Sequence, residues 1–281
     1  MLNILTLTDF SNDAYNALFY ATQLFKAEKC NFYILNTFNE HTALKKASNA
    51  KGKSLLKILE DESVEELEHV YHRIMLDTDS NPLHTFTTLS KKCDLLDHLE
   101  NIIQKEKIDF VFMGNKGKTG AKDIFLGGNT IHAIKTIKKC PLICIPKEID
   151  FRQPEKVVLS ANYEEEYSPF AMNYISKIMS LTKASLHILH LSNAKGLKEN
   201  QISKKNALSK SLQNFIVEEH LVPYKKTKAM AINEFIEKEH MDMAILVKHH
   251  HSFLQKILRE PVIFDISFYL NIPFVIIPDE D

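Results

Sequence analysis

The residues of this chain best suited to bind a charged ligand form a cluster of glycines. The 281 residues include only seven glycines, a fraction well below the usual value of about 7%, and five of them fall within 15 consecutive positions. These five are Gly114, Gly117, Gly120, Gly127 and Gly128. Glycine lets backbone N–H groups approach a ligand closely, and a helix that begins beside it presents unpaired N–H groups and a partial positive charge. We therefore expect this segment to bind an anion, with phosphate as the natural ligand.

The spacing of these glycines differs from that of two common phosphate motifs. Gly117–Thr119 resembles the end of a Walker A loop, but the first glycine of that motif would fall on Phe112. The G-x-G-x-x-G pattern of dinucleotide-binding folds is also absent from the sequence. The pattern present is G-2x-G-9x-G, formed by Gly114, Gly117 and Gly127. Because a tight turn needs only one or two glycines, the cluster favours a nucleotide site over a purely structural connection.

The elements that position the cluster follow from the apolar periodicity. Short β-like runs alternate with longer helical patterns, which predicts a parallel sheet with helices on both faces. The expected strands are residues 4–8, 32–37, 83–88, 110–113 and 142–145. The expected helices are residues 11–26, with Ser11 as the N-cap, and residues 54–75, 91–106 and 130–138. The cluster then follows the fourth strand, at the carboxyl edge of the sheet where open α/β folds bind ligands.

The same pattern begins again in the second half of the chain. The expected strands there are residues 157–160, 186–191, 224–228, 243–247 and 274–277. Residues 108–112 align with residues 241–245 at an offset of 133, and residues 140–146 align with residues 272–278 at an offset of 132. We therefore predict an α/β protein of two tandem, doubly wound, five-stranded parallel-sheet domains, at residues 1–148 and 155–281.

The glycine pattern and the strands around it resemble the universal stress protein family. The ATP-binding signature of that family reads G-2x-G-9x-G-(S/T), and here Gly127 is followed by Gly128, Asn129 and Thr130. Ile4–Ser11 resembles the family's first strand and Leu142–Pro146 its last. The resemblance extends over nearly the whole chain. It implies a tandem member of the family, with the adenine nucleotide alpha hydrolase-like fold.

The resemblance also implies a nucleotide site in the N-terminal domain. The implied ligand is ATP, or ADP or AMP, with Mg²⁺ beside the phosphates. Asp9 is implied to hold the ribose or the adenine edge, and Thr8 and Thr37 to line the base pocket. The other implied contacts are Met113, Gly114 and Gly117 at the ribose and α-phosphate, and Gly127, Gly128, Asn129 and Thr130 at the β- and γ-phosphates.

Two positions depart from the family pattern. Leu7 replaces the usual proline of the first strand, and Gly128 replaces the Ser or Thr whose hydroxyl donates to phosphate. Loss of one hydroxyl donor weakens binding by about 0.5–1.5 kcal/mol, unless Asn129 or Thr130 compensates.

The second half has lost the features of a phosphate site. Glu260 and Pro261 stand where Gly127 and Gly128 stand in the first half, and Asn162 replaces Asp9. We therefore predict that the second domain is degenerate and does not bind ATP in the family manner. Its loop carries three adjacent histidines, residues 249–251, which a loop rarely directs at one ion. We expect solvated or interface histidines and assign no metal site, while a metal, an acidic-ligand or a pH-responsive site stays open as the alternative.

The resemblance implies a switch in stress response or signalling. A bound nucleotide would order the loop at residues 114–130 and change a surface that another protein, or a second copy of the chain, recognises. The last strands, residues 142–145 and 274–277, are expected to pair within the chain as a pseudo-dimer, and a homodimer is also open.

Two alternative functions stay open beside the nucleotide switch. One is a slow ATPase, for which Asp123 and His132 are the candidate bases near the loop. The His-x-Gly-His and Ser-Gly-Gly-x-Asp-Ser motifs of catalytic relatives are absent, and we assign no catalytic residue. The other is a nucleotide-independent interaction protein in which both loops are structural.

Composition limits the partners and the compartment. The 35 Lys and Arg residues balance 36 Asp and Glu residues, which argues against a nucleic-acid partner. No uninterrupted apolar segment approaches the length of a membrane span. The four cysteines form no C-x-x-C pair and are expected to be reduced, which favours a cytoplasmic protein.

Overall fold

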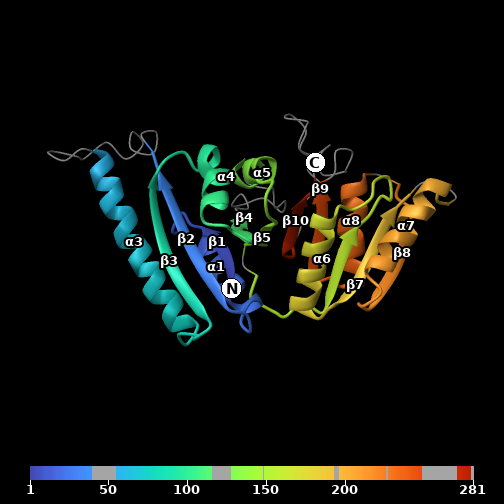
Figure 1. Cartoon of the computed structure of the whole chain (residues 1–281), viewed down its shortest axis with the longest axis horizontal. Coiled ribbons are helices and arrows are strands. Elements are labelled where there is room, and N and C mark those ends of the chain that lie inside the picture. Colours follow the sequence, from blue (N-terminus) through green and yellow to red (C-terminus); the bar gives the residue numbers. More distant parts are fainter. Residues whose placement is uncertain are drawn as a thin grey trace. The chain divides into compact units, whose positions relative to one another are not determined.

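The computed structural model describes residues 1–39, 55–115, 128–147, 149–192, 196–225, 227–248 and 271–279. It has two compact units (Figure 1). The N-terminal unit contains Met1–Asn115 and His132–Phe151, and the C-terminal unit contains Arg152–Asp281 together with Lys116–Ile131. The expected boundary between the domains, near residues 148–155, stays a prediction.

Strands and helices alternate along the first half of the chain, as the periodicity predicts. They are β1 (Leu2–Leu7), α1 (Asn12–Leu24), β2 (Cys30–Phe38), α3 (Leu55–Asp77), β3 (His84–Lys92), α4 (Leu95–Lys105), β4 (Phe110–Asn115), α5 (Gly128–Thr136) and β5 (Leu142–Pro146). The strands lie in the order β3-β2-β1-β4-β5. All neighbours in this order are parallel.

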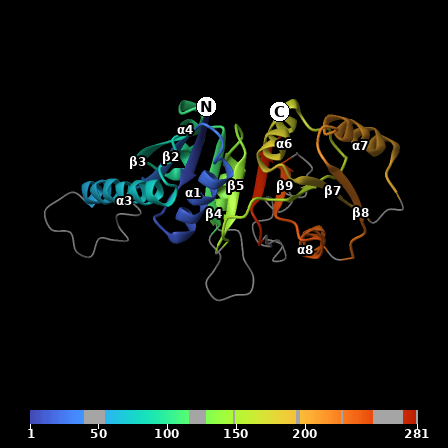
Figure 2. The ribbon, with the colours of Figure 1, turned by 90° about the horizontal axis from the view of Figure 1, so that it is seen from below.

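Helices cover both faces of this sheet. Helix α1 contacts β1, β4 and β5, α3 contacts β2 and β3, and the two helices contact each other, so they share one face. After β3 the chain returns across the sheet to β4, in the direction opposite to the earlier connections. Because connections between parallel strands are right-handed, this reversal places the next helix on the other face. Figure 2 shows α4 on the far side of the strands from α1 and α3. The predicted doubly wound arrangement is confirmed.

The C-terminal unit repeats the same topology. Its elements are β6 (Lys156–Ser160), α6 (Pro169–Thr182), β7 (Ser185–Leu191), α7 (Glu199–Ser211), β8 (Val217–Val222), α8 (Lys228–Glu239), β9 (Met243–Lys248) and β10 (Phe274–Pro278). The parallel order β10-β9-β6-β7-β8 corresponds to β5-β4-β1-β2-β3 of the first unit. The first residues of β4 and β9, and of β5 and β10, differ by the predicted offsets of 133 and 132. The tandem repeat is thereby confirmed.

Burial explains why most strands are readable from the sequence. Strands β5 and β10, five residues each, and β9 are buried along their whole length. Parallel strands covered on both faces are continuous apolar runs. The predicted N-cap of α1 is also confirmed, because the Ser11 hydroxyl accepts a hydrogen bond from the N–H of Ala14 at 3.3 Å.

Two expectations for the outer strands are wrong. The strand expected at residues 224–228 lies instead at Val217–Val222, and α8 begins at Lys228 with Thr227 as its N-cap. Strand β3 extends to Lys92, so α4 begins at Leu95 rather than Lys91. Many residues of both strands are exposed. The sequence therefore lacks the continuous apolar run from which a buried strand is predicted.

Cys30, Cys140 and Cys144 are buried free thiols, and Cys93 is a partly buried one. Burial raises the pKa of the Cys30 thiol to about 12. Among the described residues, no helix combines the length and the apolar character needed to cross a bilayer.

Two buried histidines should lower the free energy of unfolding in acid. Burial lowers the pKa values of His84 and His190, while hydrogen bonds to the carbonyls of Phe25 and Ala161 oppose the shift. A histidine in the unfolded chain has a pKa of about 6.5. Below this pH, the unfolded chain therefore binds protons that the folded chain does not bind. We expect the free energy of unfolding to fall as the pH drops from about 7 to about 5.5, by about 1.4 kcal/mol for each pKa unit of lowering.

Urea unfolding at the two pH values measures this loss. The variant His84→Gln keeps an N–H donor for the Phe25 carbonyl but cannot titrate, and it should show a smaller loss than the native chain. An equal loss in both proteins would contradict the assignment to His84.

Candidate functional site

The candidate site lies where the direction of the chain across the N-terminal sheet reverses. Strand β1 has β2 on one side and β4 on the other. The connection after β1 moves the chain toward β2, whereas β4 and β5 continue on the opposite side. Open α/β sheets bind ligands at the carboxyl ends of strands beside such a switch point. Thr8 and Asp9 follow β1 at this edge, and Met113 and Gly114 lie there just before the last residue of β4, Asn115.

Hydrogen bonds hold the turn between β1 and α1 in a defined shape. The Thr8 N–H donates to the Leu35 carbonyl at 2.9 Å, and the Phe10 N–H donates to the Thr8 hydroxyl at 3.0 Å. The Asp9 carboxylate accepts hydrogen bonds from the N–H of Ser11, at 3.1 Å, and from its hydroxyl. Phe10 has φ 63°, a left-handed conformation that is unfavourable for a bulky residue. The turn therefore fixes an exposed carboxylate at the start of α1.

A cavity of about 570 Å³ opens beside this turn. It is lined by Asp9 and Phe10 of the turn, by Asn36, Thr37 and Phe38 at the end of β2, and by Leu59, Glu62, Ser63, Glu65 and Glu66 of α3. Asp9 and Thr37, which the sequence places in one site, thus line the same cavity. Its carboxylates accept hydrogen bonds, so the cavity suits a ligand that presents hydroxyl or amino donors. Phosphate would be repelled by the same carboxylates.

A buried chain of hydrogen bonds supports the wall of the cavity. The Asn36 side-chain amide donates to the Thr8 carbonyl at 2.8 Å, and its oxygen accepts from the Ser63 hydroxyl at 2.9 Å. The Ser63 hydroxyl in turn accepts from the Ser90 hydroxyl at 2.8 Å. These contacts connect β1, β2, α3 and β3. Satisfied buried polar groups make such a wall rigid.

Gly114 has a packing role that is independent of any ligand. A Cβ atom at this position would lie 2.6 Å from the carbonyl oxygen of Asp13 and 2.8 Å from its carbonyl carbon. The end of β4 can approach the first turn of α1 this closely only without a side chain. The same residue therefore brings the β4 backbone, at Met113 and Gly114, to the switch point.

The predicted phosphate contacts are described only in part. Gly128, Asn129 and Thr130 form the first turn of α5, with Gly128 and Asn129 exposed and Thr130 buried. Among the described residues, a Cβ added to Gly128 would meet no atom within 4 Å. Gly117 and Gly127 lie outside the described residues, as does Asp123. His132, the other base considered for an ATPase, is exposed on α5. The assembly of the phosphate site stays a prediction.

The counterpart turn in the C-terminal unit has different hydrogen bonding. Tyr163 occupies the position of Phe10 and has φ 56°. The side-chain oxygen of Asn162 accepts from the Glu164 N–H at 3.0 Å, and its amide donates to the Glu164 carboxylate at 3.3 Å. The side-chain amide of Gln201 donates to the Asn162 carbonyl at 3.0 Å. The bond from the N–H two residues later is the same one that Asp9 accepts from Ser11, and the bonds of the Asn162 amide and of Gln201 are additional. Residues 249–261, the counterpart of the glycine loop, lie outside the described residues.

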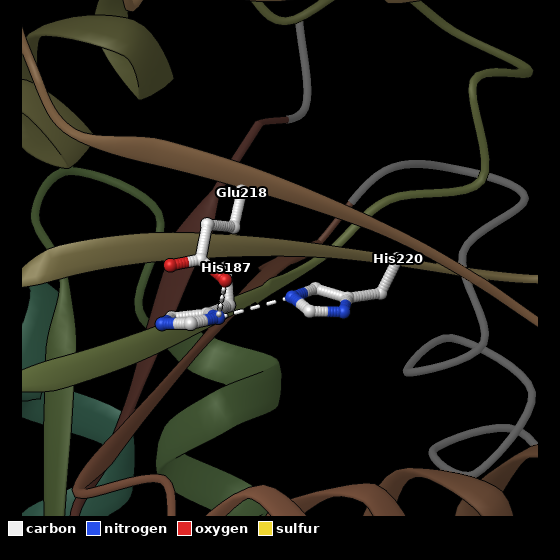
Figure 3. Close-up of side chains that lie close together, drawn as sticks. All are labelled: His187, Glu218 and His220. Atoms are coloured by element: carbon white, nitrogen blue, oxygen red, sulfur yellow. Dashed lines mark hydrogen bonds and ion pairs between the residues drawn. The ribbon is translucent and has the colours of Figure 1, made fainter.

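One cluster of polar side chains was missed by the sequence analysis. His187 of β7 lies beside Glu218 and His220 of β8 in the C-terminal unit (Figure 3). Within the sequence these residues are separated by about 30 positions, and only the register of β7 and β8 brings them together. The sequence predicts the strand that carries two of them at residues 224–228, so it does not indicate that Glu218 and His220 share one face of a strand.

Comparisons with known proteins agree with the fold. The model of the universal stress protein family matches residues 1–146. No curated protein matches the sequence. The structure of a universal stress protein from Archaeoglobus fulgidus DSM 4304 is 17% identical and covers 99% of this chain and 97% of its own, with a TM-score of 0.68.

Two structures from Pseudomonas aeruginosa are also similar over almost the whole chain. One, from strain UCBPP-PA14, is 11% identical and covers 98% of this chain and 92% of its own, with a TM-score of 0.57. The other, a functionally unknown protein from strain PAO1, is 11% identical and covers 99% of this chain and 92% of its own, with a TM-score of 0.52. At these identities the likeness concerns the fold.

Two glycine variants should separate packing from ligand binding. We expect Gly114→Ala to lower the free energy of unfolding by about 1–3 kcal/mol, because the new methyl group meets the Asp13 backbone. The matched variant Gly128→Ala should change it by less than about 0.5 kcal/mol, because the added Cβ meets nothing. Urea unfolding measures both. Equal effects of the two substitutions would contradict the close packing at Gly114.

Proposed function

The chain belongs to the universal stress protein family, and on that premise we propose that its N-terminal unit binds an adenine nucleotide as a stress-response or signalling module. The observation that carries this proposal is the cavity beside the turn after β1, at the carboxyl ends of β1 and β2, which Asp9 and Thr37 line together. Its position is the one at which open α/β sheets bind nucleotides.

The chemistry of the cavity fits the nucleoside part of the ligand. Ribose presents two hydroxyl donors and adenine an amino group, and the carboxylate of Asp9 is fixed at the rim to accept from one of them. Thr37 adds a hydroxyl from the end of β2. A hydrogen bond between a ligand hydroxyl and a charged acceptor is worth about 1.5–3 kcal/mol. We therefore assign the ribose or the adenine edge to Asp9.

The phosphates belong elsewhere, because the carboxylates of α3 repel them. We propose that they extend toward the glycine loop and the first turn of α5, where Gly128 and Asn129 are exposed. Unpaired N–H groups and the helix dipole favour anions at such a turn, and no acidic residue lies in it. Mg²⁺ beside the phosphates would offset their remaining charge. We name ATP as the ligand, with ADP and AMP as the alternatives for the test.

The C-terminal unit is proposed to lack a nucleotide site. Asn162 replaces the carboxylate of Asp9, and its side chain is bonded to the backbone and carboxylate of Glu164. A single site per chain suits a switch, in which a nucleotide alters the glycine loop of one unit and a partner protein reads the change. Such a switch requires that the nucleotide bind one state of the loop more tightly than the other.

Nucleotide binding should raise the stability of the N-terminal unit. A ligand at 100 times its dissociation constant stabilises the folded state by about 2.7 kcal/mol, so a millimolar concentration of ATP should raise the melting temperature measurably if the dissociation constant is about 10 μM. We expect Asp9→Ala to remove most of this shift and the counterpart variant Asn162→Ala to retain it. Melting curves of each protein without nucleotide provide the baseline. No shift for the native chain with ATP, ADP or AMP would contradict the proposal.

A serine at position 128 should strengthen the binding of ATP. The family places a hydroxyl donor there, and no atom of the part of the chain that the structure describes lies within 4 Å of an added Cβ. One regained hydrogen bond of about 0.5–1.5 kcal/mol corresponds to a gain of about 2- to 13-fold in affinity. Titration calorimetry with Gly128→Ser, and with Gly128→Ala as the control that adds a methyl group without a donor, measures the gain. If serine and alanine have equal effects, position 128 does not contact phosphate.

A further inference from the structure

The C-terminal unit brings two imidazoles and a carboxylate together on one face of its sheet. His187 is the third residue of β7, and it is paired in register with Glu218 of β8. His220 follows Glu218 by two residues, so both side chains emerge on the same face of β8. Figure 3 shows the three side chains directed toward one another. His187 and Glu218 lie near the amino ends of their strands, and His220 lies in the middle of β8.

The distances within this cluster are those of metal ligands. The Nδ1 atom of His187 lies 3.0 Å from Nε2 of His220 and 3.7 Å from a carboxylate oxygen of Glu218. The three ligand atoms all lie within 4.8 Å of one another. Tetrahedral zinc with bonds of about 2.0–2.1 Å separates its ligand atoms by about 3.4 Å, a value between the first two distances. Because the third pair lies only within 4.8 Å, bringing all three atoms to one ion requires a movement of up to about 1.4 Å, which the exposed Glu218 side chain can supply.

Hydrogen bonds determine which nitrogen of His187 is available. The Ser185 hydroxyl lies 3.2 Å from the Glu155 carbonyl, to which it donates, and 3.0 Å from Nε2 of His187. With its proton committed to the carbonyl, this hydroxyl accepts from the Nε2–H of His187. The lone pair of Nδ1 then faces the cluster. A metal-bound histidine is usually oriented in this way, by a hydrogen bond from its other nitrogen.

Burial and the neighbouring groups define a site with one open side. The His187 side chain is buried, that of Glu218 is 58% exposed, and His220 is partly buried. The ring of Phe235 on α8 meets the His220 ring edge to face at 4.9 Å and restrains its orientation. The cluster is therefore fixed on its inner side and accessible to a hydrated ion from outside.

We propose that His187, Glu218 and His220 bind a divalent zinc ion, with water as the fourth ligand. Two imidazoles and one carboxylate are ligands that zinc prefers, whereas magnesium and calcium favour oxygen alone. The ion takes the place of the proton that the two imidazoles share in the metal-free chain. It joins β7 to β8, the outermost strand of this unit, and so holds the exposed strand in register. The site does not depend on nucleotide binding by the other unit.

The test is zinc titration calorimetry on the full chain after removal of metal with a chelator. The expected result is one saturable site that the exposed variant Glu218→Gln weakens by about 10-fold or more, and that His220→Gln weakens further. Cobalt at the same site should give the visible absorption of a tetrahedral complex, and zinc should abolish it. Because Glu218 is largely exposed, its variant is expected to fold, which unfolding curves can verify.

A control variant excludes the three adjacent histidines at residues 249–251. Replacement of residues 249–251 by glutamine should leave the zinc site and the cobalt spectrum unchanged. Zinc binding that this variant removes, and that His187→Gln and His220→Gln retain, would overturn the proposal. A native chain that binds zinc no more tightly than about 100 μM would also overturn it and would leave the cluster as a pair of imidazoles that share a proton.

Discussion

In each unit the five strands run parallel, and every strand therefore ends at the same edge of its sheet. This constraint determines where chemistry can occur, because the loops that follow the strands all gather at that edge. In the N-terminal unit it brings Asp9, from the end of β1, and Thr37, from the end of β2, to one cavity. The close contact of Gly114 with the Asp13 backbone brings the end of β4 against the first turn of α1. Residues far apart in the sequence thus form one site because the sheet is parallel.

The two units keep this framework and differ in the chemistry of their turns. Phe10 and Tyr163 both adopt a left-handed conformation after the first strand of their unit. A bulky residue in that conformation is unfavourable, and its retention in both units indicates that the turn geometry is part of the fold. The side-chain oxygens of Asp9 and Asn162 both accept from the N–H two residues later, but Asp9 is a carboxylate, whereas Asn162 is an amide that also donates to the Glu164 carboxylate. The repeat therefore preserves the shape of the turn and changes the groups it offers to a ligand.

The sequence predicts the parts of this structure that burial makes regular. Strands such as β9 and β10 are continuous apolar runs, and their offsets from β4 and β5 reveal the repeat. Strand β8 is half exposed and has charged residues in its centre, so the sequence predicts it at the wrong position, residues 224–228. The cluster on β7 and β8 depends on that strand and on its register, which no local pattern in the sequence contains. The cavity could be expected through Asp9 and Thr37, but the contribution of α3 required the packed structure.

The central claim is that the N-terminal unit alone holds an adenine nucleotide, at the turn after β1. Hydrogen–deuterium exchange of the full chain, with and without ATP and Mg²⁺, tests it at both turns in one experiment. Bound nucleotide should slow the exchange of amides in peptides that span the turn at Asp9 and should leave peptides that span the turn at Asn162 unchanged. Absence of slowing at the Asp9 turn, or equal slowing at both turns, would contradict the account.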